Sequence, residues 1–219
     1  MDELDQLGLH FGTDKASSHH GYLRFYQRFL EEIRQEAKTI LEIGVYQGAS
    51  LRMWSGYFPQ AKIIGVDISP ECRAVASGRI QIEVADQSNP MELAKLLRHA
   101  PFDLVVDDGS HQWNHQITSF RYLYPHVRPG GYYILEDLVT SYGTYVPTYQ
   151  GISTISTATY LQRMSDYLVG DSVLAGQPEE DAFLRAAAAA TEFIAYHKFT
   201  SLMRRKGNVQ QSFGVQIPL

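Results

Sequence analysis

The sequence predicts an α/β fold in which helices cover both faces of a mostly parallel sheet. Between residues 39 and 138, five short apolar runs rich in Ile and Val alternate with spacers of helical length. Strands that are apolar on both faces are typical of a buried parallel sheet, and such spacers suit the crossover helices that join parallel strands. Four of the five runs end in acidic residues. In this kind of sheet the carboxyl ends of the strands form the edge where ligands bind.

The composition is that of a single folded domain. The 219 residues are 44% hydrophobic and carry a formal net charge of -5, which excludes a generally basic nucleic-acid binder. Cys72 is the only cysteine, so neither a disulfide framework nor a Cys-based metal site is possible. The first residues are acidic, unlike a signal peptide, and no apolar run approaches the roughly 18 residues that span a bilayer. We therefore expect a cytoplasmic protein with no nucleic-acid or membrane partner.

The first half of the chain is predicted to contain one helix and the five core strands. Residues 1–21, which contain G-T-D-K-A-S-S-H-H, are predicted to be irregular. Residues 22–37 form an amphipathic helix, because their apolar side chains recur on one side. The core strands begin at Thr39, Lys62, Ile80, Phe102 and Gly131.

The second half adds two helices and a pair of strands. Residues 141–160 are rich in Tyr, Thr, Ser and Gly and too polar for the core. One helix is expected near residues 159–168. A second begins at Pro178 and includes the alanine run 186–190, which has a high helix propensity. The end of the chain is predicted to form two strands joined by a turn near Lys198.

A glycine-containing turn follows the first core strand in the segment L-E-I-G-V-Y-Q-G-A-S, residues 41–50. Gly44 and Gly48 would let the backbone approach a ligand closely, although two glycines also suit an ordinary tight turn. Asp67 ends the second strand, nineteen positions after Gly48. An acid at that place accepts hydrogen bonds from the two hydroxyls of a ribose.

Two further features favour an adenosine-containing cofactor over a dinucleotide. Asp86 and Gln87 end the third strand and form a polar edge suited to an adenine amine. The loop lacks the third glycine that helps a pyrophosphate approach a helix end. Glu42, inside the first strand, is either a hydrogen-bonded core acid or a partner for a cationic group of the ligand.

Three or four carboxylates are predicted to meet where the fourth and fifth strands end, if those strands are neighbours in the sheet. Asp107 and Asp108 close the fourth strand in V-V-D-D-G-S-H, and Glu136 and Asp137 close the fifth. Such a cluster is costly unless a cation neutralises it, and oxygen ligands favour Mg²⁺. His111 follows the glycine and is placed to act as a general base. In the plainer interpretation, one of Asp107 and Asp108 caps the next helix and the histidine is a surface residue.

Several motifs together resemble the metal-dependent sugar O-methyltransferases of macrolide biosynthesis, the mycinamicin and macrocin type. They are D-D-G-S-H, F-R-Y-L-Y-P-H-V-R-P-G-G-Y-Y-I-L-E-D-L, T-S-Y, G-T-D-K, L-E-I-G-V-Y-Q-G, S-L-R-M-W and the late F-I-A-Y-H-K-F-T-S-L-M-R-R-K-G. The resemblance covers residues 11–207, and the motifs are specific as a set.

The resemblance implies a Rossmann-like S-adenosylmethionine-dependent methyltransferase fold with seven strands, of which the last is antiparallel. It also implies Mg²⁺ held by Asp108, Glu136 and Asp137, with His111 as the general base. The single domain, residues 1–219, would then comprise an N-terminal loop and helix (1–37), a cofactor-binding core (38–138), a lid and helix (139–178), and a C-terminal helix and strand hairpin (179–219). The expected cofactor-binding residues are Glu42, Gly44, Tyr46, Gly48, Ser50, Asp67, Ile68, Asp86, Gln87 and Asp107.

The implied reaction is methylation of a hydroxyl of a sugar on a natural product, by a protein that we expect to form a homo-oligomer. Tyr142, Tyr145 and Tyr149 either form a lid that stacks on the sugar or belong to a structured surface loop. The alternatives are a catechol or polyol O-methyltransferase, a protein like the cephalosporin hydroxylases, a nicotinamide-dependent oxidoreductase, and a non-enzymatic cofactor-binding subunit.

Overall fold

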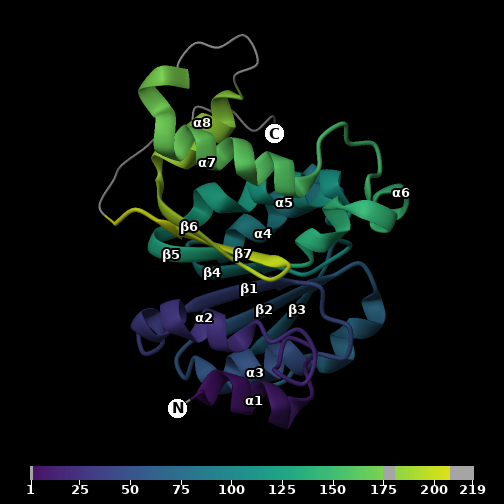
Figure 1. Cartoon of the computed structure of the whole chain (residues 1–219). Coiled ribbons are helices and arrows are strands. Elements are labelled where there is room, and N and C mark those ends of the chain that lie inside the picture. The colour runs from purple at the N-terminus through teal and green to yellow at the C-terminus, as the bar shows by residue number, and fades with distance from the viewer. Residues whose placement is uncertain (1, 175–180, 208–219) are drawn as a thin grey trace.

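A seven-stranded mixed sheet with helices on both faces organises the chain in the computed structural model, which describes residues 2–174 and 181–207 (Figure 1). The strand order is β3-β2-β1-β4-β5-β7-β6. The first five strands in the chain pair in parallel, whereas β7 is antiparallel to both β5 and β6. The strands are β1 (Thr39–Ile43), β2 (Lys62–Asp67), β3 (Ile80–Val84), β4 (Phe102–Asp107), β5 (Val127–Leu135), β6 (Thr191–His197) and β7 (Thr200–Arg205).

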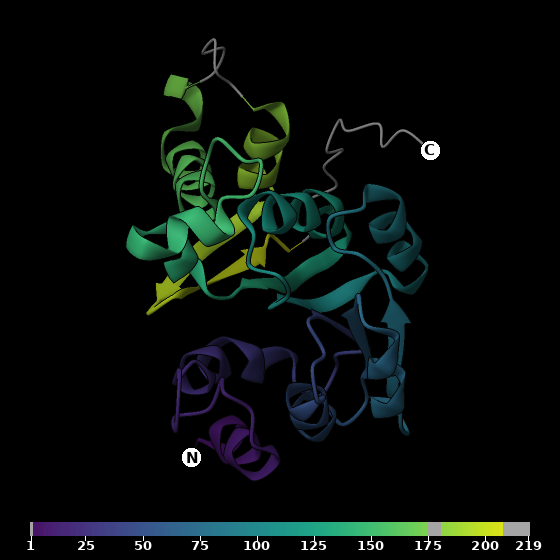
Figure 2. The same ribbon diagram turned by 90° about the vertical axis from the view of Figure 1, so that its right-hand side faces the viewer.

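The helices form one layer on each face of the sheet (Figure 2). The α-helices are α1 (Glu3–Phe11), α2 (Leu23–Leu30), α3 (Ala49–Tyr57), α4 (Pro90–Leu96), α5 (Trp113–Leu123), α6 (Val146–Tyr149), α7 (Thr157–Leu174) and α8 (Ala182–Ala189). Short 3₁₀ turns are η1 (Glu31–Ile33), η2 (Pro70–Val75), η3 (Leu97–His99), η4 (Tyr124–His126), η5 (Leu138–Ser141) and η6 (Gly143–Tyr145). Within the described residues, no helix has the length and apolar character needed to cross a membrane.

Apolar side chains on both faces of the central strands build two cores, one on each side of the sheet. Ile40 points into the core shared with α1, α2 and α3, while its neighbour Leu41 points into the core shared with α4, α5, α7 and α8. Ile63 and Ile64 divide in the same way on β2. Successive side chains of a strand alternate between faces, so continuous apolar runs are what a sheet buried on both sides requires. The predicted fold, including the antiparallel last strand, is confirmed.

The prediction that residues 1–21 are irregular is wrong over α1. This helix ends at Gly12, whose φ of 75° is left-handed, and its Gly8 packs against Leu23 so closely that a Cβ there would lie 2.2 Å from that side chain. Leu4 is fully buried. Leu4, Leu7 and Phe11 recur at helical spacing and pack into one core, so the segment does carry an amphipathic pattern, although only two turns long.

Other predicted boundaries shift. The helix predicted over residues 22–37 is shorter, since α2 gives way to η1, and the fifth strand starts at Val127, before Gly131. The helix expected near residues 159–168 is longer and has a non-helical backbone at Gly170. α8 starts after Asp181, whose carboxylate accepts a hydrogen bond from the backbone N–H of Leu184 at 3.0 Å. The start predicted at Pro178 lies outside the described residues. The terminal pair of strands is confirmed.

The carboxyl ends of the central strands are joined at one edge of the sheet. Beyond the ladders, the N–H of Gly44 donates to Val66, that of Asp108 to Ile43, and that of Glu136 to the carbonyl of Asp107. The loops after β1, β4 and β5 therefore leave the sheet side by side, and the predicted site residues are carried on them.

Candidate active site

The glycine loop after β1 is shaped by two close approaches. Gly44 has a φ of 96°, and a Cβ there would lie 2.1 Å from the carbonyl oxygen of Asp108. Gly48, with a φ of 73°, precedes α3, and a Cβ there would lie 2.2 Å from the side chain of Val75. Both positions therefore require glycine for space as well as for backbone conformation.

Asp67 ties this loop to the end of β2. One carboxylate oxygen accepts hydrogen bonds from the N–H groups of Val45 at 2.9 Å and Tyr46 at 3.3 Å, and the other accepts from Ser69 at 2.9 Å. Burial raises the pKa of Asp67, but these three backbone donors outweigh it and leave the pKa below its usual value. The carboxylate is ionised at neutral pH and is still able to accept from ligand hydroxyls.

A cavity of about 810 Å³ lies over these strand ends. Its volume is within the range of small-molecule sites. Ten of the predicted site residues line it: Gly44, Tyr46, Ser50, Asp67, Ile68, Asp86, Gln87, Asp108, His111 and Asp137. The sequence-predicted cofactor loop and the predicted catalytic cluster are therefore parts of one cavity.

Glu42, Gly48, Asp107 and Glu136 are not among the residues that line this cavity. Glu42 is fully buried, and one of its oxygens accepts from Ser50 Oγ at 2.8 Å and Trp54 Nε1 at 3.1 Å. Of the two roles open for it, the structure places it as a hydrogen-bonded core acid. Burial raises the pKa of Glu42 to about 7, partly opposed by a nearby lysine.

Asp107 lies behind the cavity wall and holds a residue that lines it. It is fully buried and accepts from Gln87 Nε2 at 2.6 Å and from Ser119 Oγ. The carbonyl oxygen of the Gln87 side chain accepts in turn from the N–H of Ser110 at 3.1 Å. Burial raises the pKa of Asp107 to about 6. Its side chain is thus placed to orient Gln87 and not to face the cavity.

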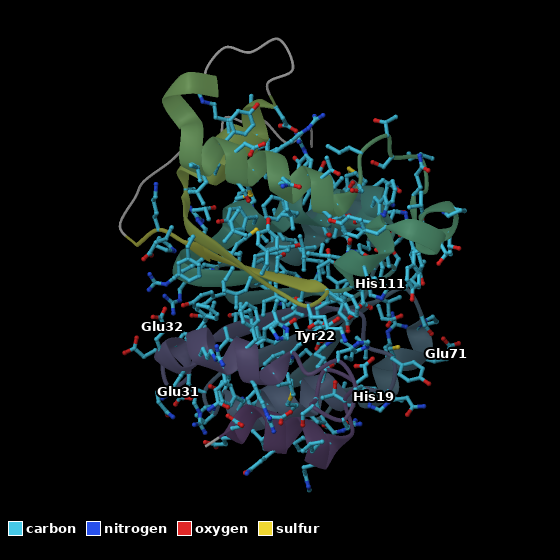
Figure 3. All side chains as sticks on the ribbon, viewed as in Figure 1. His19, Tyr22, Glu31, Glu32, Glu71 and His111 are labelled. Carbon is cyan, nitrogen blue, oxygen red and sulfur yellow. The ribbon has the colours of Figure 1, made fainter. Side chains whose placement is uncertain are left out.

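Asp108, His111 and Asp137 form the acidic end of the cavity. Each offers one possible ligand atom, and these atoms lie within 4.8 Å of one another. His111 Nε2 is 3.4 Å from Asp137 Oδ2, and the other oxygen of Asp137 accepts from Tyr22 OH at 3.0 Å. Tyr22, from the N-terminal helical layer, and His111, from the opposite layer, lie at the same edge of the sheet (Figure 3).

The donor set in this group fits a hard divalent cation. Carboxylate oxygens are the ligands that Mg²⁺ prefers, usually with several waters retained, and this group offers two of them. The Nδ1 atom of His111 is buried and has no hydrogen-bond partner among the described residues. A buried polar atom without a partner is costly, and such atoms are expected where a ligand or ion completes a site.

Glu136 is not part of this group, and its carboxylate pairs with a buried lysine that the sequence analysis missed. Its carboxylate accepts from Lys15 Nζ at 2.9 Å and from Tyr26 OH at 2.9 Å. Burial raises its pKa well above the usual range, partly opposed by Lys15. Lys15 belongs to the G-T-D-K motif, and a single lysine in a loop gives no sign that it is buried. A further missed residue is His115, which lines the cavity and lies 2.7 Å from Ser110 Oγ.

Of the three tyrosines predicted to form a lid or a surface loop, Tyr142 lies between η5 and η6, Tyr145 ends η6, and Tyr149 ends α6. The ring centroid of Tyr149 is 6.3 Å from that of His111 and 6.3 Å from that of Tyr145. Tyr142 lines a second cavity of about 540 Å³ together with Tyr196. Tyr142 is 60% exposed and Tyr145 47%, so both have ring surface free for contact with a ligand.

Comparison with known proteins agrees with this geometry. Residues 41–138 match a methyltransferase domain family. The chain is 44% identical over 148 residues to demethylmacrocin O-methyltransferase of Streptomyces fradiae, covering 64% of this chain and 37% of that enzyme. It is 33% identical over 213 residues to a rhamnosyl-tetracenomycin-C 3'-O-methyltransferase of Streptomyces olivaceus, covering 91% of this chain and 52% of the other.

A solved structure of a similar protein supports the same assignment. The methyltransferase MycE of mycinamycin biosynthesis, solved in complex with Mg and SAH, superposes with a TM-score of 0.83 at 29% identity. The match covers 99% of this chain and 57% of MycE. The chain thus spans about half the length of the relatives it matches, or less. Residues 41–138 thus carry a methyltransferase domain, and the chain is similar in sequence and in fold to these sugar O-methyltransferases.

Proposed function

We propose that this chain catalyses transfer of a methyl group from S-adenosylmethionine to a hydroxyl of a sugar on a natural product, with a divalent cation, Mg²⁺, at the acidic site. The observation that carries this proposal is the placement of Asp108, His111 and Asp137 at one end of the cavity whose other end is formed by the glycine loop and Asp67. A methyl donor and an acceptor must meet head-on, and a single cavity with these two ends provides that arrangement.

Hydrogen-bond acceptors and backbone groups line the part of the cavity that would bind the cofactor. Asp67 would accept hydrogen bonds from the ribose hydroxyls, and Asp86 with Gln87 would bind the adenine edge. Gly44 would allow the methionine part to approach the backbone. S-adenosylmethionine supplies an activated methyl group, because the sulfonium sulfur leaves as a neutral thioether.

At the acidic end, Asp108 and Asp137 are the residues that face the cavity and would hold the cation. Glu136, the third predicted ligand, would join them only if its carboxylate left Lys15 and Tyr26. A bound divalent cation would supply positive charge that favours the ionised form of an acceptor hydroxyl. The chain itself provides His111, whose Nε2 would accept the hydroxyl proton while Asp137, 3.4 Å away, stabilises the imidazolium.

The tyrosines and the similar enzymes support a sugar as the acceptor. The names of those enzymes include demethylmacrocin and a rhamnosyl-tetracenomycin-C. Aromatic rings stack on the apolar faces of sugars, and Tyr142, Tyr145 and Tyr149 lie beside His111 or have exposed rings. A neighbouring pair of sugar hydroxyls would place two oxygens near Asp108 and Asp137. A cytoplasmic location and assembly into a homo-oligomer belong to the same proposal.

The test is calorimetric titration of S-adenosylhomocysteine into metal-free protein, repeated with Mg²⁺. We expect micromolar binding, and NADH at the same concentrations is the negative control. A panel of rhamnosyl and deoxysugar glycosides is then assayed with S-adenosylmethionine, with and without chelator. Absence of S-adenosylhomocysteine binding in both conditions would contradict the methyl donor. Turnover that chelator leaves unchanged would contradict the metal.

A further inference from the structure

Lys15 lies at the centre of the carboxylate cluster, although it comes from the N-terminal segment outside the matched domain. It is 1% exposed. Its ammonium nitrogen is 2.9 Å from Glu136 Oε2 and 3.3 Å from Glu42 Oε1, and it also contacts Asp108 Oδ2. The three carboxylates belong to three neighbouring strand ends, so one ammonium group bridges the edge of the sheet.

The loop between α1 and α2 carries Lys15, and its own backbone contacts hold it in place. Its ends, Gly12 and Gly21, both have left-handed φ values of 75° and 73°. The N–H of Tyr22 donates to the carbonyl of Lys15 at 2.9 Å, which folds the loop over the residue. The backbone at Lys15 is therefore held in place, and its ammonium group belongs to a buried side chain and not to a flexible one on the surface.

Asp108 is shared between this lysine and the group that would bind the cation. One of its oxygens contacts Lys15, and the residue also belongs to the group of possible ligands with His111 and Asp137. A positive charge buried this close to a cation site opposes the cation electrostatically, because little solvent screens the two charges. The same charge stabilises the carboxylates when no cation is bound.

We propose that Lys15 is the resident counter-cation of the acidic site: it balances Glu42, Asp108 and Glu136 in the metal-free protein and competes with the divalent cation for Asp108 and Glu136. Lys15 is thus a positioning residue that sets the affinity of the site for metal. The inference rests on the proposed metal site. It accounts for the absence of Glu136 from the group of possible ligands, since its carboxylate is held by Lys15 and Tyr26.

The experiment measures Mg²⁺ binding without turnover. Isothermal titration of Mg²⁺ into metal-free protein is compared between wild type and Lys15→Met at one pH. We expect the dissociation constant for Mg²⁺ to fall about tenfold in the variant, as one nearby positive charge is lost. The thermal midpoint of the metal-free variant should also fall, because three carboxylates lose their counter-charge. Lys62→Met is the matched control, since Lys62 begins β2 at the opposite edge of the sheet.

Two further measurements keep the inference testable if Lys15→Met does not fold. Lys15→Gln keeps hydrogen-bond donors without the charge and should tighten Mg²⁺ binding in the same direction. In wild type, the ¹⁵N resonance of the buried Lys15 ammonium group should shift when Mg²⁺ is added.

The outcomes separate this inference from the proposed function. Unchanged or weaker Mg²⁺ binding in the Lys15 variants, with S-adenosylhomocysteine binding retained, overturns the competition. A Lys15 ammonium resonance that does not shift when the protein is saturated with Mg²⁺ also overturns the competition. Wild-type protein that binds S-adenosylhomocysteine but no Mg²⁺ overturns the metal site of the proposed function, and this inference with it.

Discussion

Single residues at the cavity adopt backbone conformations that side chains rarely take. Among the described residues, four that are not glycine have positive φ, and three of them line the cavity: Tyr46 at 48°, His111 at 57° and Asp137 at 55°. Each such residue costs of the order of 1–3 kcal/mol, so it persists only where the surroundings impose it. The strain is concentrated where His111 and Asp137 face each other, as expected if their geometry serves catalysis.

His111→Ala should lower turnover by about 10²-fold or more while leaving S-adenosylhomocysteine affinity unchanged, because the proposed general base is removed and the proposed cofactor site is untouched. Steady-state rates with a glycoside acceptor and calorimetric titration measure the two effects separately. His19→Ala, at an exposed histidine of the N-terminal loop, is the control (Figure 3). Near wild-type turnover in His111→Ala would remove this residue from the mechanism.

At the scale of elements, the end of β1 and the loop after β4 share one narrow space at Gly44. Gly44→Ala should destabilise the fold by about 2 kcal/mol or more, since the new methyl group would meet the carbonyl of Asp108. The displaced loop should also weaken S-adenosylhomocysteine binding. Urea unfolding and calorimetry measure the two effects.

Gly78→Ala separates the clash at Gly44 from the cost of the left-handed backbone. Gly78 has a φ of 54°, and a Cβ there would have no heavy atom within 4 Å. It should cost only about 1 kcal/mol and leave cofactor binding unchanged. Equal losses of stability in the two variants would show that the approach of Asp108 does not constrain Gly44.

Asp103 anchors the opposite end of the central strands. Its buried carboxylate accepts from the N–H groups of Lys38 and Thr39, both at 2.8 Å, and pairs with Arg128. Asp103→Ala should cost about 2 kcal/mol of unfolding free energy, because these donors lose their acceptor. S-adenosylhomocysteine affinity should not change, since the residue lies at the far edge of the sheet. Glu36→Ala, at an exposed acid, is the control. If Asp103→Ala were as stable as wild type, Asp103 would not stabilise this end of the strands.

At the scale of the whole molecule, stability should fall as pH decreases below about 6.5, partly because of His126. Burial and the neighbouring Arg205 lower the pKa of this histidine in the folded state. At pH values below the pKa that His126 has in the unfolded chain, the unfolded chain binds a proton more readily than the folded protein does. Protonation therefore favours unfolding. His126→Gln should therefore lose less stability than wild type between pH 7 and pH 5. Urea unfolding of metal-free protein measures this, and equal losses would contradict it.

Local patterns were sufficient to predict the sheet and much of the site. Runs such as residues 62–67 are apolar on both faces, and this pattern depends only on neighbouring residues. Asp67, Asp108 and Asp137 follow strands, and strand ends in a parallel sheet meet at one edge, so their convergence on the cavity was predictable. α1 was missed although Leu4, Leu7 and Phe11 stand at helical spacing, because a pattern of only two turns is a weak signal.

Local sequence could not show the direction in which each acidic side chain points, or which positively charged side chain it contacts. Glu42 and Asp107 lie in strands like the other candidates, yet both are turned into the core, where each accepts from a serine on the helix that follows its strand. Lys15 is 93 residues from Asp108 and 121 from Glu136 in the chain. Residue order and periodicity report on neighbours a few positions apart, whereas the charge balance of a buried site depends on contacts between segments that only the folded chain brings together.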